Sequence, residues 1–428
     1  MPRLARWTLG LATLALLAAA PARPQGLSGP ETGIKAMGMA GAWTAQANDP
    51  TAIYYNPGGL ALFKKGKLTA GFSAFYHNES QYQGLPPGAG AGTTGQQEQF
   101  FTWPVHAFAV KPLGPKLKLG LGVSSPYAFK SRWENADNTF PGRFVSKRSE
   151  LQTYDTNVTL SWQATPNLGL GLSGIYRNSK LSYARNLAGV NPATGLSVDV
   201  GSLNMETDFN GDFGGQVGLL QKIGKAFAWG LVYRSPIDVE QTGAGRLTQI
   251  STGNSQLDQL NRATFPYDTD LPLATTIRYP ASAGLGIAVS PSEKLLIETD
   301  VDWSGWSHFK DLNVSFPTHA SFNNSPQGEP YDDALAYRLG VRLGIGKGMQ
   351  LRFGYAFEET PQPDASLSPF LPDANRSIVS LGFGRDWLDI GFQYVAPENR
   401  IVRSISGPNA LNGAYSGNSY LLGISITK

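Results

Sequence analysis

Few side chains in this 428-residue sequence could carry out covalent chemistry. It contains no cysteine and four histidines, at His77, His106, His308 and His319. Only His106 lies within an expected strand, and no Asn or Asp partner for it is evident. No metal-ligand spacing, nucleotide-binding loop or nucleophile elbow is present. The sequence therefore predicts a protein that is not an enzyme and that needs no cofactor or metal.

Three acidic residues and three arginines form the clearest polar pattern. The acids alternate with apolar residues along one expected strand, so they share one face, unlike the opposed carboxylates of a glycosidase. The arginines lie on the polar faces of the next two expected strands, which places a basic ladder beside the acidic one. We expect a structural ion network that ties a barrel wall to a plug, rather than a permeation filter. Its expected members are Glu298, Asp300, Asp302, Arg338, Arg342 and Arg352.

The elements that would position these residues are β-strands. Apolar side chains alternate with small or polar ones at a period of two, for example at Leu351, Phe353, Tyr355 and Phe357. An apolar face opposite a face of small and polar residues is typical of a lipid-exposed barrel wall. The pattern predicts an all-β fold, a transmembrane antiparallel β-barrel of 14 strands. The expected strands centre on Phe72, Phe108, Leu121, Leu160, Leu172, Leu219, Leu231, Leu285, Ile297, Val341, Phe353, Leu381, Phe392 and Leu422.

The connections between these strands alternate in length, as periplasmic turns and extracellular loops of an up-and-down barrel require. The short ones lie at 112–116, 164–167, 222–225, 290–294, 346–349 and 385–386. The long ones span 77–100, 125–150, 178–208, 236–280, 305–334, 358–376 and 397–418. We expect both termini on the periplasmic side.

The first residues resemble a secretory signal peptide. Arg3 and Arg6 precede an apolar run from Trp7 to Ala20, and Ala20-Pro21-Ala22 fits a cleavage site. We expect residues 1–22 to be removed on export. Beyond them no stretch approaches 18 uninterrupted apolar residues, so membrane-spanning helices are not expected. The formal net charge of +3 is too small to indicate a nucleic-acid partner.

The segment from Gly33 to Phe63 differs from the strand pattern. It is rich in Gly and Ala, carries few charges, and turns at Asn56, Pro57 and Gly58. A barrel of this size needs either water or a plug in its lumen. We therefore expect residues 23–66 to form an N-terminal hatch that plugs the lumen, and residues 67–428 to form the barrel.

Several motifs resemble the FadL/TodX family, outer-membrane channels for long-chain fatty acids and aromatic hydrocarbons. The hatch segment carries Gly38, Gly41-Ala42, Asp49 and Asn56-Pro57, with Gly58 where the family turn has Ala. Later motifs are Asp300–Phe309 with its two tryptophans, Tyr337-Arg338, Arg352–Tyr355 and Leu371-Pro372-Asp373. They occur in the family's order, and the resemblance covers nearly the whole mature chain.

The resemblance implies passive uptake of small hydrophobic molecules across the outer membrane. In the family, substrate binds in a groove between two extracellular loops and passes to a pocket that contacts the start of the hatch. Here the loops would be 178–208 and 236–280, which hold more aliphatic residues than water-facing loops need. Simple packing of these loops on each other is an equally open interpretation. The expected substrate contacts are Leu27, Leu181, Tyr183, Leu187, Leu196, Leu257, Leu260 and Phe265.

The family resemblance also implies a sideways exit at a kink in the third strand. Gly120, Gly122 and Pro126 would form this lateral opening, because Gly and Pro disrupt a strand ladder. A fatty acid would need a cation for its carboxylate, whereas a toluene-like molecule would need none. Such a cation could come from Arg177, Arg185 or Arg234, although these side chains could instead bind lipopolysaccharide phosphates.

A general porin for polar solutes is the alternative function. Long loops and inward Arg and Asp side chains would allow it, whereas the expected plug argues against it. The expected partners are a hydrophobic small molecule, outer-membrane lipid with lipopolysaccharide, and the barrel assembly machinery. We expect a monomer located in the outer membrane.

Overall fold

A computed structural model describes residues 32–78, 80–88, 90–133, 140–192, 194–309, 312–320, 330–405 and 411–428. The signal-peptide prediction and Leu27 lie outside the described residues. Within the described ranges, no helix is long and apolar enough to cross a membrane.

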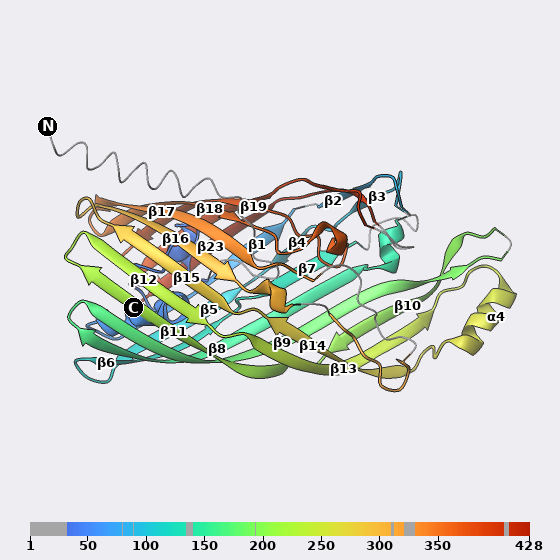
Figure 1. Ribbon diagram of the computed structural model, residues 1–428, viewed down its shortest axis with the longest axis horizontal. Coiled ribbons are helices and arrows are strands. Elements are labelled where there is room, and N and C mark those ends of the chain that lie inside the picture. Colours follow the sequence, from blue (N-terminus) through green and yellow to red (C-terminus); the bar gives the residue numbers. More distant parts are fainter. Residues whose placement is uncertain are drawn as a thin grey trace.

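Fourteen strands close into one antiparallel barrel (Figure 1). The closing pair joins β23 to β1, with partners running from Thr69 and Thr427 to His77 and Ser419. Every expected strand centre falls inside one of these strands, which confirms the barrel prediction. The strands are β1 Lys67–His77, β5 Val105–Pro112, β6 Leu117–Ser124, β8 Arg148–Thr165, β9 Leu168–Val190, β11 Asn210–Ile223, β12 Phe227–Arg234, β15 Ser282–Val289, β16 Leu295–Ser304, β17 Ala334–Gly346, β18 Met349–Glu358, β19 Arg376–Arg385, β20 Leu388–Pro397 and β23 Ser419–Thr427.

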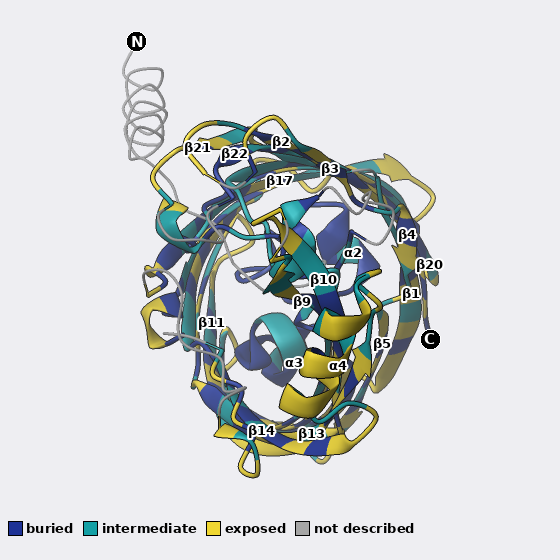
Figure 2. Ribbon diagram, turned by 90° about the vertical axis from the view of Figure 1, so that its right-hand side faces the viewer, coloured by how far each residue is buried: buried dark blue, intermediate teal, exposed yellow. Residues whose placement is uncertain are grey.

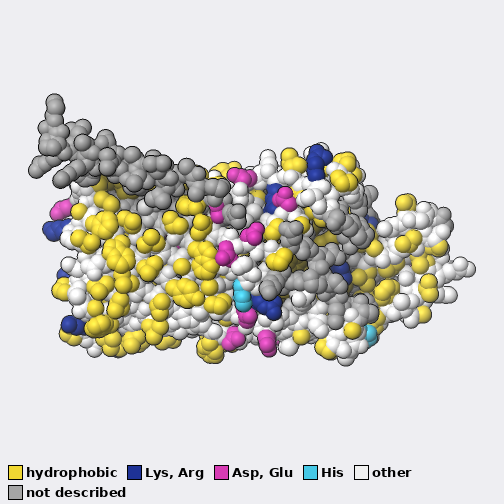
Figure 3. All heavy atoms as spheres, in the orientation of Figure 1, with side chains coloured by type: hydrophobic (Ala, Val, Ile, Leu, Met, Phe, Trp, Pro, Cys, Tyr) yellow, Lys and Arg dark blue, Asp and Glu magenta, His cyan; other side chains and the backbone are white. Residues whose placement is uncertain are grey.

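Side chains of the wall alternate between the outside and the inside of the barrel with a period of two. On β23, Leu422 and Ile426 are exposed on the outside, whereas Leu421 and Ser425 face inward and are buried. Exposed apolar side chains gather in a broad band around the end of the barrel that carries the short turns (Figure 3). Such a band is the surface that lipid covers in an outer-membrane barrel.

Two of the long connections are not loops, so this part of the prediction was wrong. The chain of 178–208 and 236–280 forms an arm of strands that continues the wall beyond the barrel (Figure 1). The arm consists of the end of β9 with β10 Ser197–Thr207, β13 Ile237–Gln249 and β14 Asp270–Tyr279, paired in that order. Alternating apolar residues such as Leu203 and Leu247 bury one face of this sheet, which is why it folds as strands.

Short elements complete the end that carries the arm. Helix α4, Ser255–Thr264, is capped by Asn254, whose side chain accepts hydrogen bonds from the Gln256 and Leu257 N–H groups. A small separate sheet and three short 3₁₀ turns cover the rest of this end. These are β2 Gln81–Gly84, β3 Thr94–Gln96, β21 Arg400–Val402, β22 Gly413–Ser416, η3 Pro141–Phe144, η4 Trp306–His308 and η6 Asp364–Ser366.

The chain from Thr32 to Phe63 lies inside the barrel (Figure 2). It forms α2 Ile34–Met37, α3 Ala52–Tyr55 and the 3₁₀ turn η2 Pro57–Leu62. Its small residues allow close contact with the wall, and most of its side chains are fully buried. We call this segment the hatch.

Candidate transport site

The hatch turn is fixed by the side chain of Asn56. Its Oδ1 accepts a hydrogen bond from the Gly58 N–H (3.0 Å), and its Nδ2 donates to the Thr44 and Leu219 carbonyls (2.9 Å each). A Cβ at Gly58 would lie 2.8 Å from the Leu220 nitrogen on β11. Glycine therefore lets the turn approach the wall backbone more closely than alanine would.

Two of the expected acids hold the hatch by its backbone instead of pairing with arginine. Residues 43–46 present four consecutive N–H groups to β16. Asp300 accepts from the first two (2.9 Å each), and Glu298 accepts from the last two (2.6 and 3.3 Å). Both carboxyl groups are fully buried, so these bonds replace the water that the four hatch amides would otherwise bind.

The third acid belongs to an ion network as expected, but its arginine also reaches the hatch. The Arg338 guanidinium donates to Asp302 (2.7 Å), to the Ala40 carbonyl (2.8 Å) and to Glu358 on β18 (2.8 Å). Glu358 was not among the predicted members. It is buried at the end of its strand, where sequence pattern alone gives no partner.

The remaining predicted arginines differ in their environments. Arg352 donates to Asp389 on β20 (2.8 Å), and Lys35 of the hatch lies 3.8 Å from the same carboxylate. Arg342 is half-buried and stands opposite Arg352 in the register of β17 and β18. Asp389 was missed, although its place between Leu388 and Ile390 puts it on the inner face.

The third barrel strand is interrupted between β6 and β7 Ala128–Arg132. Ser124 pairs with Asp155 and Ala128 pairs with Gln152, so four steps on this strand oppose three on β8. Within the interruption, Thr153 bonds the backbone of Tyr127 with its hydroxyl, both as acceptor and as donor. A side chain thus satisfies backbone groups that a continuous ladder would have paired.

The neighbouring strand is interrupted at the same level. β4 Phe100–Thr102 pairs with β1, and β5 begins after Trp103 and Pro104. Towards the arm end, the two sides are joined again where the Glu98 N–H donates to the Arg132 carbonyl (2.9 Å). Between these points a cavity of about 460 Å³ lies in the wall.

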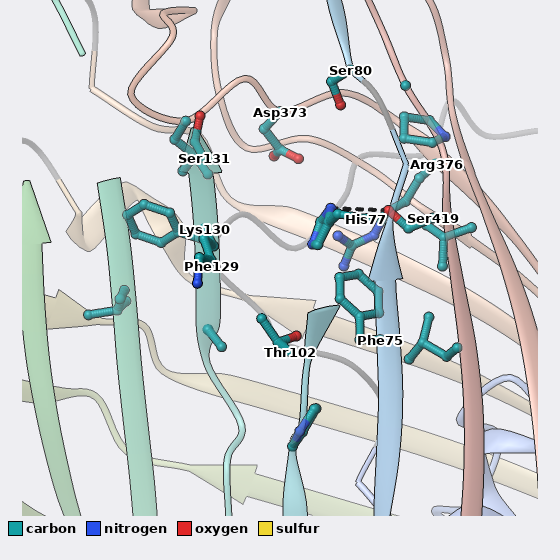
Figure 4. A pocket seen from close by; sticks show the side chains of 18 of the residues that line it. Phe75, His77, Ser80, Thr102, Phe129, Lys130, Ser131, Asp373, Arg376 and Ser419 are labelled. Atoms are coloured by element: carbon teal, nitrogen blue, oxygen red, sulfur yellow. Dashed lines mark hydrogen bonds between the residues drawn. The ribbon is translucent and has the colours of Figure 1, made fainter. Parts of the chain in front are cut away.

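This cavity, which we call the wall pocket, is lined by residues of β1, β7, β19 and β23 and of the loops beside them (Figure 4). Its inner lining includes Phe75, Ile378, Val395 and Leu421, which pack in one cluster with Ile34 and Met37 of α2. Its outer lining includes Phe101, Trp103 and Tyr154, whose exposed fractions are 54, 59 and 40%. The wall pocket therefore has an apolar inner lining that packs beside the hatch, and exposed aromatic side chains on its outer side.

Polar groups line the rim of the wall pocket. His77 accepts from or donates to Ser419 through its Nδ1 (3.2 Å), and Arg376 binds Glu358 (2.6 Å). Asp373, from the loop before β19, accepts a hydrogen bond from Thr360 (2.6 Å). Burial raises the pKa of the Asp373 carboxyl above its ordinary value.

Two of the glycines predicted to form the lateral opening lie elsewhere, which corrects that assignment. Gly120 and Gly122 are in the regular part of β6, paired with both neighbours. A Cβ at Gly120 would lie 2.7 Å from Leu60 of the hatch, and one at Gly122 would lie 2.3 Å from the Phe108 ring. They give space to packed side chains, whereas Pro126 does lie at the interruption.

The predicted substrate-contact residues do not form one groove. Leu181 lies in a buried cluster with Tyr127, Tyr279 and Trp306, which we call the lid cluster. Tyr183 packs on Phe370 and bonds the Val145 carbonyl. Of the others, Leu187 and Phe265 pack within the arm, Leu257 is half-buried on α4, and Leu196 and Leu260 are exposed on the arm.

The axial route past the lid cluster is crossed by a buried cation. Arg177 makes two hydrogen bonds to Asp155 (2.8 and 2.7 Å), and its guanidinium lies over the rings of Tyr127 and Tyr279 (4.4 and 4.6 Å). Nearer the hatch lies a cavity of about 110 Å³ lined by polar groups that include Arg234. An apolar molecule would gain little there compared with the wall pocket.

Comparisons with known proteins agree with this geometry. A family model described as outer membrane protein transport protein (OMPP1/FadL/TodX) matches residues 15–428. The long-chain fatty acid transport protein of Escherichia coli K12 is 22% identical over 418 residues, which cover 89% of each chain.

Solved structures show the same fold. A Pseudomonas aeruginosa FadL homologue superposes with a TM-score of 0.77 at 20% identity, covering 94% of this chain and 99% of that one. The Ralstonia pickettii toluene transporter TbuX gives a TM-score of 0.66 at 16% identity, covering 93% and 98%. The matching family consists of transport proteins, which agrees with the expectation of a non-enzyme. The chain therefore belongs to the OMPP1/FadL/TodX family and is a protein of the outer membrane.

Proposed function

We propose that this protein mediates passive uptake of small hydrophobic molecules, which enter from the arm end and leave sideways through the wall pocket. Relatives and structural neighbours named for fatty acid or toluene transport support this class of cargo. The observation that carries the proposed route is the wall pocket itself. It joins a cluster containing hatch residues to exposed aromatic side chains on the lipid-facing wall.

The energetics favour this exit over the lumen. Each buried CH₂ group contributes about 0.8 kcal/mol, a gain that an apolar pocket and a bilayer both provide. The space between the hatch and the lid cluster is polar and small by comparison. The buried hatch also argues against a general porin, because it fills the lumen that polar solutes would use. No energy source is required as long as the free concentration inside stays low.

Two further partners belong to this proposal. Basic side chains on the outside of the arm end, such as Lys180 and Arg278, would bind lipopolysaccharide phosphates in exchange for their exposed partners Glu206 and Asp238, because exposed ion pairs are weak. The barrel assembly machinery would act where β23 and β1 close the ring, a seam held by reciprocal bonds between Leu68 and Lys428 (2.8 Å each). The proposed hatch boundary, near residue 66, lies just before β1.

Closing the interruption tests the lateral route. Deleting Ser125 together with Pro126→Val would match three steps on the third strand to three on β8 and supply the missing N–H. We expect the barrel to fold and uptake of a labelled hydrophobic probe to fall to that of cells without the protein. A matched control is deletion of Ala164, which lies at another register shift, beside a short turn. Undiminished uptake after the Ser125 deletion would contradict the proposed route.

A further inference from the structure

The cations of the wall pocket are already bound to carboxylates. Lys130 and Arg376 are the Lys and Arg side chains of its described lining, which also contains His77. The Lys130 Nζ lies 3.2 Å from Glu150 on β8, and the Arg376 Nε lies 2.6 Å from Glu358. Asp373 adds a third acidic residue to the lining, so no positive charge is left in excess.

These pairs are held in place by further contacts. Gln152 donates to the second carboxylate oxygen of Glu150 (2.9 Å), and the Lys130 ammonium lies 5.3 Å from the centre of the Phe100 ring. Glu358 is bound from its other side by Arg338. A ligand carboxylate would have to displace one of these partners or stay unpaired in a partly dehydrated site, and both cost free energy.

The cations along the axial route, Arg177 and Arg234, also have partners within the protein. Arg177 makes two hydrogen bonds to the Asp155 carboxylate, whereas Arg234 donates to the neutral Tyr54 carbonyl (3.0 Å) and lies over the Tyr54 ring. Arg185 does not line the wall pocket. Within the described residues, the wall pocket thus offers apolar surface and paired charges, and the cations of the axial route are already hydrogen-bonded.

We propose that the wall pocket selects uncharged apolar molecules over carboxylates, and that Glu150 determines this selectivity by neutralising Lys130 at the opening. The proposal rests on the proposed uptake function and specifies its substrate class. Because Glu150 already pairs with Lys130, a ligand carboxylate finds no free cation there, and this disfavours the wrong ligand.

The test compares two probes with the same chain length, 1-dodecanol and dodecanoate, at about pH 8, where the acid is ionised. Uptake is measured in cells that lack their own fatty acid transporter, with and without the full-length protein. We expect the unmodified protein to raise dodecanol uptake and to leave dodecanoate uptake near background. Glu150→Gln keeps the contact with Gln152 but frees Lys130, so dodecanoate uptake should rise about tenfold relative to dodecanol uptake.

Two controls separate selectivity from folding and from general transport. The double variant Glu150→Gln with Lys130→Gln should lose the gained dodecanoate uptake, because the freed cation is removed. Glu206→Gln disrupts an exposed pair with Lys180 outside the pocket and should change neither probe. Equal uptake of both probes by the unmodified protein, or an unchanged ratio in Glu150→Gln, would overturn the selectivity. Uptake of neither probe would instead overturn the proposed function.

Discussion

The two sides of this barrel share the same alternating strand pattern but have different structural roles. From β15 to β20 the one register shift in the described ladders lies beside a short turn, at Gly344 and Gly346; β19 and β20, for example, pair over their whole lengths from Arg376 to Arg385. The side formed by β4, β5, β6 and β7 is broken on two adjacent strands at one level. The continuous side anchors the hatch through buried charges, whereas the broken side contains the wall pocket. An irregular stretch is tolerated because the ring stays closed above and below it.

The largest expected effect comes from removing the hatch, which the continuous side anchors. Deletion of residues 33–63 should convert a nearly closed channel into a conducting pore while the barrel stays folded. The ring of backbone hydrogen bonds is complete without the hatch, as the β23–β1 seam shows. Planar-bilayer recording of the variant beside the full-length chain measures this. An unchanged conductance would mean that the hatch does not obstruct the lumen.

A smaller effect is expected from weakening the anchor alone. Asp300→Ala would leave the N–H groups of Trp43 and Thr44 without acceptors, at a cost of about 1–3 kcal/mol for each. We expect brief conducting openings and faster proteolysis of the hatch. Asp300→Asn, which retains an acceptor oxygen, is the matched control and should show a weaker effect. If the alanine variant shows no more conducting openings than the parent protein, the hatch is held mainly by its other contacts.

Overpacking beside the interruption should have the smallest effect. Gly122→Val would push against Phe108 and Ile53 and should lower the free energy of unfolding by about 1–3 kcal/mol. Uptake per folded molecule should persist, because Gly122 lies in the paired part of β6. Gly174→Val, where a Cβ meets no atom within 4 Å, is the control. Thermal unfolding and probe uptake, measured together, separate an effect on packing from an effect on transport. Loss of uptake with normal stability would show that Gly122 belongs to the lateral opening after all.

The sequence predicted the barrel wall well because burial on one face repeats every two residues, and a slip of one residue would expose that face. The same rule identified Asp300 as inward-facing but could not supply its partners, Trp43 and Thr44, which lie more than 250 positions away in the chain. Glycine was ambiguous at Gly122, since a glycine on an inner face either breaks a ladder or makes room for a side chain. The arm was missed because its segments were predicted to be long loops between barrel strands, and their apolar residues form a buried face only when β10 and β13 pair.

The central claim, that cargo leaves through the broken side of the wall, is tested most directly by reversible blockade at single cysteines. The chain has no native cysteine, so Thr102→Cys in the wall pocket and Ser282→Cys in the polar cavity near the hatch would each be the only reactive thiol. Each is modified with a bulky methanethiosulfonate reagent, and the extent is checked by mass spectrometry. We expect modification at Thr102→Cys to abolish dodecanol uptake until the adduct is reduced, and equal modification at Ser282→Cys to leave uptake unchanged. The reverse pattern would show that cargo passes along the barrel axis and would contradict the account.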